Sequence, residues 1–118
     1  MPRTRYLATA VAATLLYSAT TAASQFSQVV VFGDSLSDNG NISLASNPAV
    51  QPPLRFTTNP GTLGIEHLAS NLGFTLTPSL TGGSDYAWGG AGVLTNSPGT
   101  PAAVPTISSQ IAGYLAGR

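Results

Sequence analysis

The feature that most constrains the fold is an apolar run that stops abruptly in a polar cluster. Residues 29–41 read VVVFGDSLSDNGN, in which four apolar residues end at Gly33 and small polar residues follow. β-branched and aromatic residues favour strands, and a short apolar run bounded by turn residues fits a buried strand. The sequence therefore predicts a buried strand over residues 29–32 whose carboxyl end carries the polar cluster.

The rest of the chain alternates irregular segments with short elements. Residues 42–60 are expected to be irregular because they contain four prolines, two of them in Asn-Pro steps. An apolar stripe at helical spacing predicts a helix over residues 62–72, with Gly73 at its C-terminal cap. Residues 74–77 alternate like a short strand, and residues 106–116 predict a second helix. The order strand, helix, strand, helix predicts an α/β fold in which helices cover a sheet.

Residues 1–23 have the pattern of a secretory signal peptide. Two arginines form a basic start, residues 6–19 are mostly apolar, and residues 21–23 are the small residues that precede a cleavage site. The alternative is an uncleaved membrane anchor, but a spanning helix needs about 20 predominantly apolar residues, and this run is shorter and contains threonines. We therefore expect export and one domain over residues 24–118, beginning near Ser24.

Composition excludes several classes of function. The chain has no cysteine, so it holds neither a disulfide nor a thiolate site. It has four basic residues, no lysine and a net charge of zero, whereas a nucleic-acid surface needs clustered positive charge. Without lysine there is no phosphate-binding loop of the type G-x-x-x-x-G-K-[ST]. Leu36 stands where a calcium loop starting at Asp34 would need an oxygen ligand. We expect no nucleic-acid partner, no metal and no cofactor.

Ser35 is the candidate nucleophile of the polar cluster. A serine hydroxyl attacks an ester only when a base removes its proton and hydrogen-bond donors stabilise the resulting oxyanion. A position just past the carboxyl end of a buried strand suits the second need, because ligands of α/β sheets bind at that edge. The alternative is a serine that only caps a turn, which is the commoner role of a serine after a strand.

Four stretches together resemble the GDSL esterase/lipase family of the SGNH hydrolase superfamily. They are VFGDSLSDNGN at 31–41, RFTTNPGTLGIEHLASNLG at 55–73, GGSDYAWGGAG at 82–92 and ISSQIAGYLA at 107–116. They resemble, in the family's own order, its first block, its Arg-Phe-(Ser/Thr)-Asn-Gly segment, its block Asn-Tyr-Ala-x-Gly-Gly-Ala and the helix that follows. The resemblance implies the N-terminal part of a three-layer α/β/α sandwich of flavodoxin type, and hence an incomplete α/β fold.

The resemblance also implies the chemistry of the site. By the family's pattern Ser35 is the nucleophile of an ester hydrolase that acts on acyl or lipid-like esters. Its own backbone N–H and that of Gly90 are the implied oxyanion donors, with Gly89 as the alternative if the loop is offset by one residue. Asp34 is expected to stabilise the turn. Within the family the chain looks most like bacterial autotransporter esterases, whose passengers are anchored in the outer membrane by a C-terminal barrel, so we expect a secreted or outer-membrane location.

Two later blocks of the family do not occur in the 118 residues. These are Gly-x-Asn-Asp, which supplies an oxyanion asparagine, and Asp-x-x-His, which supplies the base and the acid that orients it. His67 is the single histidine, and we expect it to be a partly buried helix residue and not the base. The expectation is an N-terminal fragment of an ester hydrolase that is inactive alone. The alternative is a non-catalytic exported passenger or binding fragment.

Overall fold

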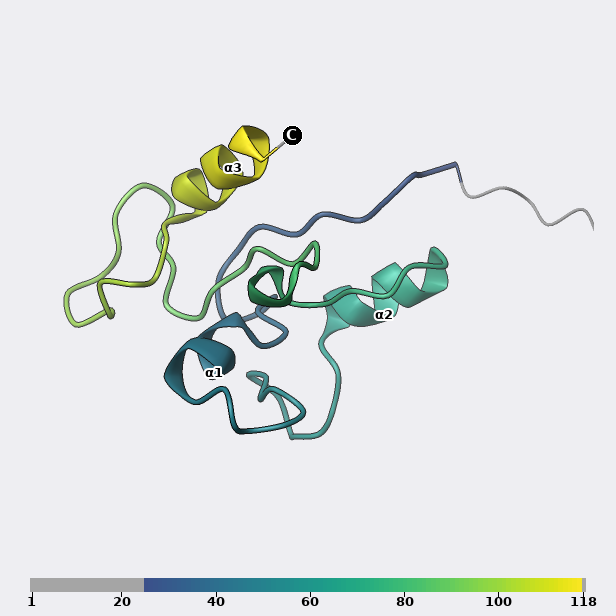
Figure 1. The fold of residues 1–118 in the computed structure, drawn as a ribbon, viewed down its shortest axis with the longest axis horizontal. Coiled ribbons are helices and arrows are strands. Elements are labelled where there is room, and N and C mark those ends of the chain that lie inside the picture. The colour runs from purple at the N-terminus through teal and green to yellow at the C-terminus, as the bar shows by residue number, and fades with distance from the viewer. Residues whose placement is uncertain (1–24, 118) are drawn as a thin grey trace, which may run out of the picture.

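The computed structural model describes residues 25–117, so the signal peptide predicted over residues 1–23 lies outside the described residues. The helices are α1 (Asn41–Ser46), α2 (Gly64–Asn71), the 3-10 helix η1 (Ser79–Thr81) and α3 (Ile107–Ala116) (Figure 1). No helix within residues 25–117 is long and apolar enough to cross a membrane.

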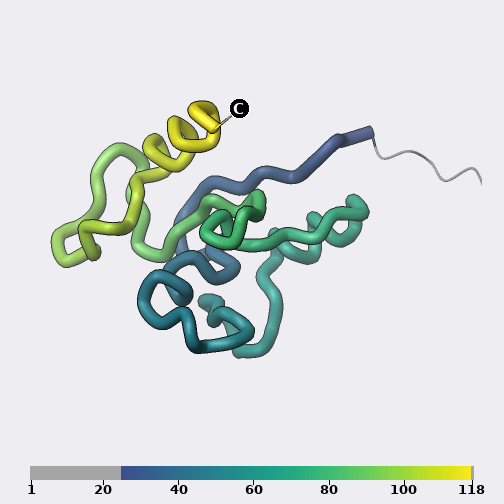
Figure 2. The backbone as a smooth tube through the Cα atoms, in the orientation of Figure 1, coloured from purple at the N-terminus to yellow at the C-terminus, as the bar shows by residue number. Residues whose placement is uncertain are grey.

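Three extended segments lie side by side in parallel. Residues 84–88 are central, since Asp85 pairs with Val31 on one side and with Pro78 on the other. The bonds to the first side run from Val31 N to Ser84 O (3.0 Å), from Tyr86 N to Val31 O (2.8 Å) and from Trp88 N to Gly33 O (3.1 Å). The backbone path in Figure 2 shows these segments at the centre of the described chain.

The strands predicted over residues 29–32 and 74–77 are wrong in extent, because each pairing is reduced to a single bridge. On the first side the next ladder bond would come from the Gly33 N–H. That group donates instead to Gln110 Oε1 at 2.9 Å, so the ladder ends there. On the other side the chain enters η1 at Ser79, which turns it away after one bridge.

Both predicted helices are present, with their caps. The helix expected over residues 62–72 is α2, and Gly73 follows it with φ +84°, a left-handed conformation that glycine adopts readily. The helix expected over residues 106–116 is α3, and Thr106 caps it by accepting the Ser109 N–H at 3.2 Å. Short-range signals thus placed both helices correctly.

Helix α1 lies in the stretch that was expected to be irregular, and that prediction is wrong. A six-residue helix is unstable alone, because the first turn costs more backbone entropy than its hydrogen bonds return. Here the Asp38 carboxylate accepts the N–H groups of Asn41 and Ile42 at 2.6 and 3.1 Å. This capping from outside the helix satisfies donors that have no partner within it.

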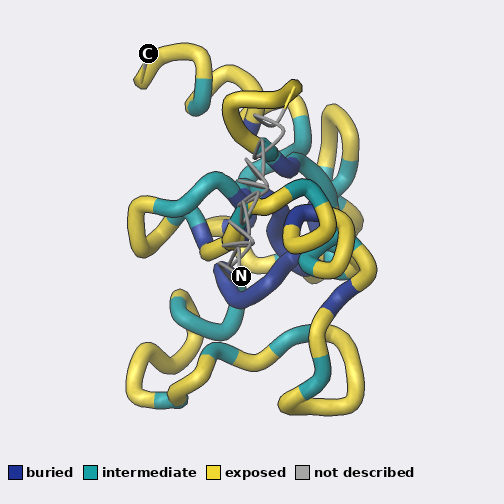
Figure 3. Tube along the Cα trace, turned by 90° about the vertical axis from the view of Figure 1, so that its right-hand side faces the viewer, coloured by how far each residue is buried: buried dark blue, intermediate teal, exposed yellow. Residues whose placement is uncertain are grey.

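The core consists of two small apolar clusters. Val31, Ala69, Leu76 and Ala87 form the first cluster, and Trp88, Ala91 and Val104 form the second. Ala87 and Trp88 are consecutive residues of an extended segment, so their side chains point to opposite faces. Residues 84–88 therefore lie between the two clusters, and Figure 3 shows the buried residues gathered in the interior of the described chain.

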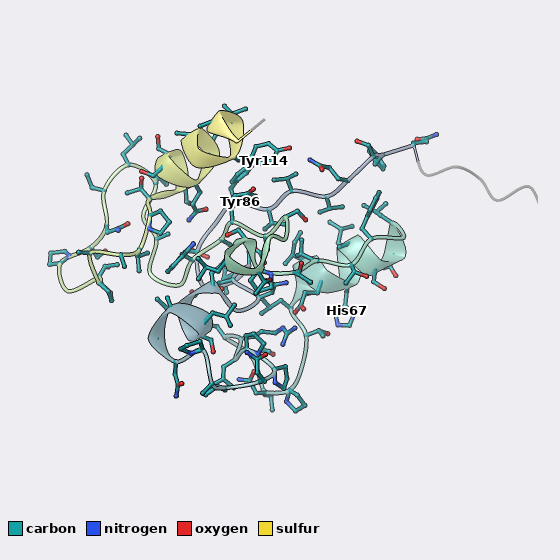
Figure 4. All side chains as sticks on the ribbon, in the orientation of Figure 1. His67, Tyr86 and Tyr114 are labelled. Atoms are coloured by element: carbon teal, nitrogen blue, oxygen red, sulfur yellow. The ribbon has the colours of Figure 1, made fainter. Side chains whose placement is uncertain are left out.

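Helix α3 packs against the extended segments through aromatic rings. The Tyr114 ring meets those of Phe32 and Tyr86 edge-on, with centroids 5.5 and 5.4 Å apart. Figure 4 shows Tyr86 and Tyr114 pointing toward one another between α3 and the central segments. Edge-on aromatic pairs are favourable beyond their buried area, so these rings fix α3 beside the turn that follows residues 29–33.

Candidate active site

The turn that carries Ser35 is built by Asp34. The Asp34 carboxylate accepts the Leu36 N–H at 3.0 Å, and the Asp34 carbonyl accepts the N–H groups of Ser37 and Asp38 at 3.1 and 3.0 Å. Such local bonds replace the strand ladder and bend the chain sharply. The expectation that Asp34 stabilises the turn is confirmed.

Ser35 itself is partly exposed at the top of this turn. Neither its hydroxyl nor its backbone N–H forms a hydrogen bond with any of residues 25–117. The neighbouring N–H groups of Leu36 and Ser37 are both engaged, as described above. The Ser35 N–H thus has the first property required of an oxyanion donor, which is that no protein acceptor occupies it.

The structure separates Gly90 from Gly89, which the sequence left as alternatives. The Gly89 N–H is buried and donates to Asp38 Oδ2 at 2.7 Å, so it is occupied. Gly90 is exposed and has φ +85°. Its N–H forms no hydrogen bond within the part of the chain that the structure describes. Of the two glycines, only Gly90 has an N–H that can turn to a ligand.

Ser35 and Gly90 lie at the same end of the paired segments. The last backbone bond between those segments joins Trp88 N to Gly33 O at 3.1 Å. Ser35 lies two residues after Gly33, and Gly90 lies two residues after Trp88. Because the pairing is parallel, both segments end on the same side of it. Two unoccupied backbone donors therefore stand on adjacent turns, at the edge where ligands of α/β sheets bind.

A buried carboxylate holds these two turns together. Asp38 is fully buried, and its four acceptor bonds come from the N–H groups of Gly40 (2.9 Å), Asn41 (2.6 Å), Ile42 (3.1 Å) and Gly89 (2.7 Å). A buried charge is tolerated only when it is well hydrogen-bonded. Asp38 meets this condition by binding backbone from both sides of the candidate site.

Asp85, Asn39 and Asn41 complete a buried polar network beneath the turns. Asp85 accepts the N–H groups of Ala87 (2.9 Å) and Asn39 (3.2 Å), and the Asn41 amide donates to the carbonyls of Asp85 and Ala87 at 2.8 and 2.9 Å. Burial raises the pKa of Asp85 to about 7, although the two N–H bonds oppose the shift. Asn39 Oδ1 is a buried acceptor without a partner among the described residues.

Gln110 of α3 fixes the start of the Ser35 turn. Its amide accepts the Gly33 N–H and donates to the Gly33 carbonyl, both at 2.9 Å. The side chain thus pairs with the backbone as a neighbouring strand would. Because Gln110 is 97 % buried, these bonds are shielded from water and hold Gly33 firmly two residues before Ser35.

His67 is exposed, so the expectation of a partly buried residue is wrong. It lies two residues from both Ile65 and Ala69, which pack into the first apolar cluster, and a two-residue step places it on the other side of α2 (Figure 4). Its Nε2 lies 2.9 Å from Thr62 Oγ1. No hydrogen bond joins it to Ser35 in the described structure, so it is not a base for that hydroxyl here.

Sequence reasoning quoted the residues of this network but missed their roles. The sequence places Asp38 and Asn41 in a polar cluster after the strand and Gln110 in a predicted helix, but it predicts none of their contacts. A signal was present for Gln110, which is a polar residue among the apolar positions of its helix. No match to the chain was found among protein-family models, curated proteins or solved structures.

Proposed function

We propose that this chain carries the nucleophile and two oxyanion donors of an exported serine hydrolase that acts on acyl esters. The observation that supports it is the pair of unoccupied N–H groups at Ser35 and Gly90, which lie on adjacent turns at the same end of the paired segments. The resemblance to the GDSL esterase/lipase family agrees with this choice of residues.

In the proposed reaction the Ser35 hydroxyl gives its proton to a base while its oxygen bonds to the ester carbonyl carbon. The carbonyl oxygen becomes an oxyanion that accepts hydrogen bonds from the Ser35 and Gly90 N–H groups. The bond to the alcohol oxygen then breaks, and that oxygen takes the proton from the base. Water hydrolyses the acyl-serine in the same way, which releases the carboxylic acid and restores Ser35. We assign the base to the Asp-x-x-His block that the resemblance implies. The His67 ring is hydrogen-bonded to Thr62 and not to Ser35.

A fluorophosphonate probe with added imidazole tests this proposal on the chain itself. Such a probe reacts with activated serines, and free imidazole can supply the base. We expect slow labelling of Ser35 without imidazole and a rate that rises with imidazole concentration. Ser35→Ala should abolish the labelling. Ser37→Ala is the matched control, because this neighbouring serine lies in the same turn, and it should label like the original chain.

Peptide mapping of the labelled product decides between the outcomes. Label on Ser37 or elsewhere, or undiminished label in Ser35→Ala, would contradict the nucleophile assignment. No label at Ser35 at any imidazole concentration would favour the alternative, a non-catalytic exported passenger.

A further inference from the structure

A cavity of about 350 Å³ lies between α1 and the loop that follows it. Its wall is mainly apolar and includes Ile42 from α1 and Val50, Leu54 and Phe56 from the loop. Figure 1 shows this loop folded back beside α1. Leu54 and Phe56 are about half exposed, at 49 % and 54 %, so the apolar surface is open to a ligand.

The wall presents no unpaired charge. Arg55 is its one charged residue, and the guanidinium binds the Glu66 carboxylate through two bonds of 2.8 Å, from Nε to Oε2 and from Nη2 to Oε1. Its Nη1 donates to the Pro53 carbonyl at 3.2 Å. A bidentate pair of this kind satisfies both partners. The chemistry of the wall therefore fits an uncharged, apolar ligand.

The cavity wall reaches the candidate active site at Gly89. A Cβ placed on Gly89 would lie 2.5 Å from Phe56 Cε2 and Cζ and 3.3 Å from Ile42 Cγ2. Both side chains line the cavity, and both pack directly on the backbone at Gly89. The next residue is Gly90, whose N–H is a proposed oxyanion donor. The cavity is therefore separated from the residue before this donor only by the Phe56 and Ile42 side chains.

We infer that this cavity binds the acyl chain of the ester whose carbonyl lies between Ser35 and Gly90. The inference rests on the proposed function for the position of the ester group. A cavity of about 150 Å³ holds a benzene ring, so this one has room for an unbranched chain of roughly six to ten carbons. A single apolar side chain of a partner protein is the competing occupant.

Binding of uncharged methyl ketones to the complete chain tests the inference without any hydrolysis. We expect the affinity to rise about fourfold for each added methylene from 2-pentanone to 2-nonanone and then to level off. The methyl NMR signals of Ile42, Val50 and Leu54 should shift on binding. Binding that does not depend on chain length, or shifts confined to other methyl groups, would overturn the inference and favour a partner side chain as the occupant.

Two variants and one control locate the binding. Val50→Trp fills the cavity and should weaken 2-nonanone binding at least tenfold. Leu54→Ser removes part of the apolar wall without filling the cavity and should weaken binding several-fold. This variant keeps the test valid if Val50→Trp fails to fold. Val93→Trp adds the same ring at a position that is 66 % exposed and outside the wall, and it should bind normally. Equal binding by Leu54→Ser and the original chain would refute the cavity as the site.

The failure of this inference can be told from failure of the proposed function. Ser35→Ala should bind 2-nonanone normally, so the cavity can stand even if Ser35 proves unreactive. Conversely, alkyl fluorophosphonates of different chain length can be compared on a folded Val50→Trp variant and on the original chain. Labelling of Ser35 with the same length preference in both would retain Ser35 as nucleophile and reject the cavity as its acyl site.

Discussion

The chain has four acidic residues, and each binds backbone N–H groups of its own fold. Asp34 accepts one such bond and Asp38 accepts four, whereas Asp85 accepts two. Glu66 accepts the Leu63 N–H at 2.8 Å in addition to its pair with Arg55. The acidic side chains therefore shape the turns around the candidate site. We expect the loss of stability on replacing each of them to increase with the burial of that side chain.

Asp38 and Asp34 form a matched pair for testing this at the residue scale. Asp38→Ala would leave four N–H groups without their acceptor, and each buried unsatisfied donor costs about 1–3 kcal/mol. We expect a loss of at least about 4 kcal/mol, close to the whole stability of a small domain. Asp34→Ala removes one exposed bond and should cost about 1 kcal/mol or less. Urea unfolding followed by circular dichroism measures both, and similar midpoints for the two variants would contradict the assignment.

Asp85 should make the free energy of unfolding depend on pH. Its pKa rises from 3.8 to about 7 on burial, so the folded chain keeps a proton that the unfolded chain has already released. The contribution of Asp85 to stability is then greatest below about pH 4, falls as the pH rises to about 7 and is level above that. The expected loss is roughly 4 kcal/mol, because the pKa rises from 3.8 to about 7 at about 1.4 kcal/mol per pKa unit. Urea unfolding across this range should show the fall, and Asp85→Asn should remove it. An equal fall in Asp85→Asn would assign the effect to another group.

At the scale of elements, sequence reasoning succeeded where the signals were local. The helices over 62–72 and 106–116 follow from apolar stripes at helical spacing, and the first also from Gly73 at its end. Helix α1 was not predicted, because its N-cap Gly40 has no capping side chain and the cap comes instead from the Asp38 carboxylate in the preceding turn. The choice between Gly89 and Gly90 depends on a bond from Gly89 to a residue 51 positions earlier. Contacts of that range carry no sequence periodicity, so only the structure could make the choice.

Two glycines at helix positions predict opposite effects of the same substitution. Gly113 lies inside α3 and Gly73 follows α2 with φ +84°, and an added Cβ would meet nothing within 4 Å at either position. Gly113→Ala should therefore stabilise the chain by about 0.5–1 kcal/mol. Gly73→Ala should destabilise it by about 1–2 kcal/mol, because an L-residue is strained in that conformation. Thermal unfolding of the two variants gives the comparison, and shifts of the same sign would contradict it.

For the whole molecule, the outer flank of residues 29–33 is an open sheet edge. In a strand, alternate residues direct their backbone groups to opposite sides. Val31 and Gly33 face residues 84–88, and the backbone groups of Val30 and Phe32 form no hydrogen bond within the described chain. Residues 25–33 contain neither a charge nor a proline, which are the usual protections of an edge.

We expect the chain to self-associate through this edge as its concentration rises. Val30→Pro removes an N–H that has no partner among the described residues, and proline is tolerated on the open side of an edge strand. This variant should remain folded and stay monomeric at higher concentration. Val31→Pro is the matched control, because it removes the 3.0 Å bond to Ser84 O and should unfold the chain. Sedimentation velocity and circular dichroism give both readouts, and unchanged association of a folded Val30→Pro would place the contact elsewhere.

The four bonds of Asp38 also have a consequence for thermal motion. The two oxygens of the Asp38 carboxylate have a fixed spacing. They accept hydrogen bonds from the backbone at the start of α1 and from the backbone at Gly89. The two turns therefore fluctuate as one body, and a displacement of the Ser35 turn carries the Gly90 turn with it. Under the proposed function, this shared carboxylate would keep the Ser35 and Gly90 donors at a more constant spacing than two loops without a common contact.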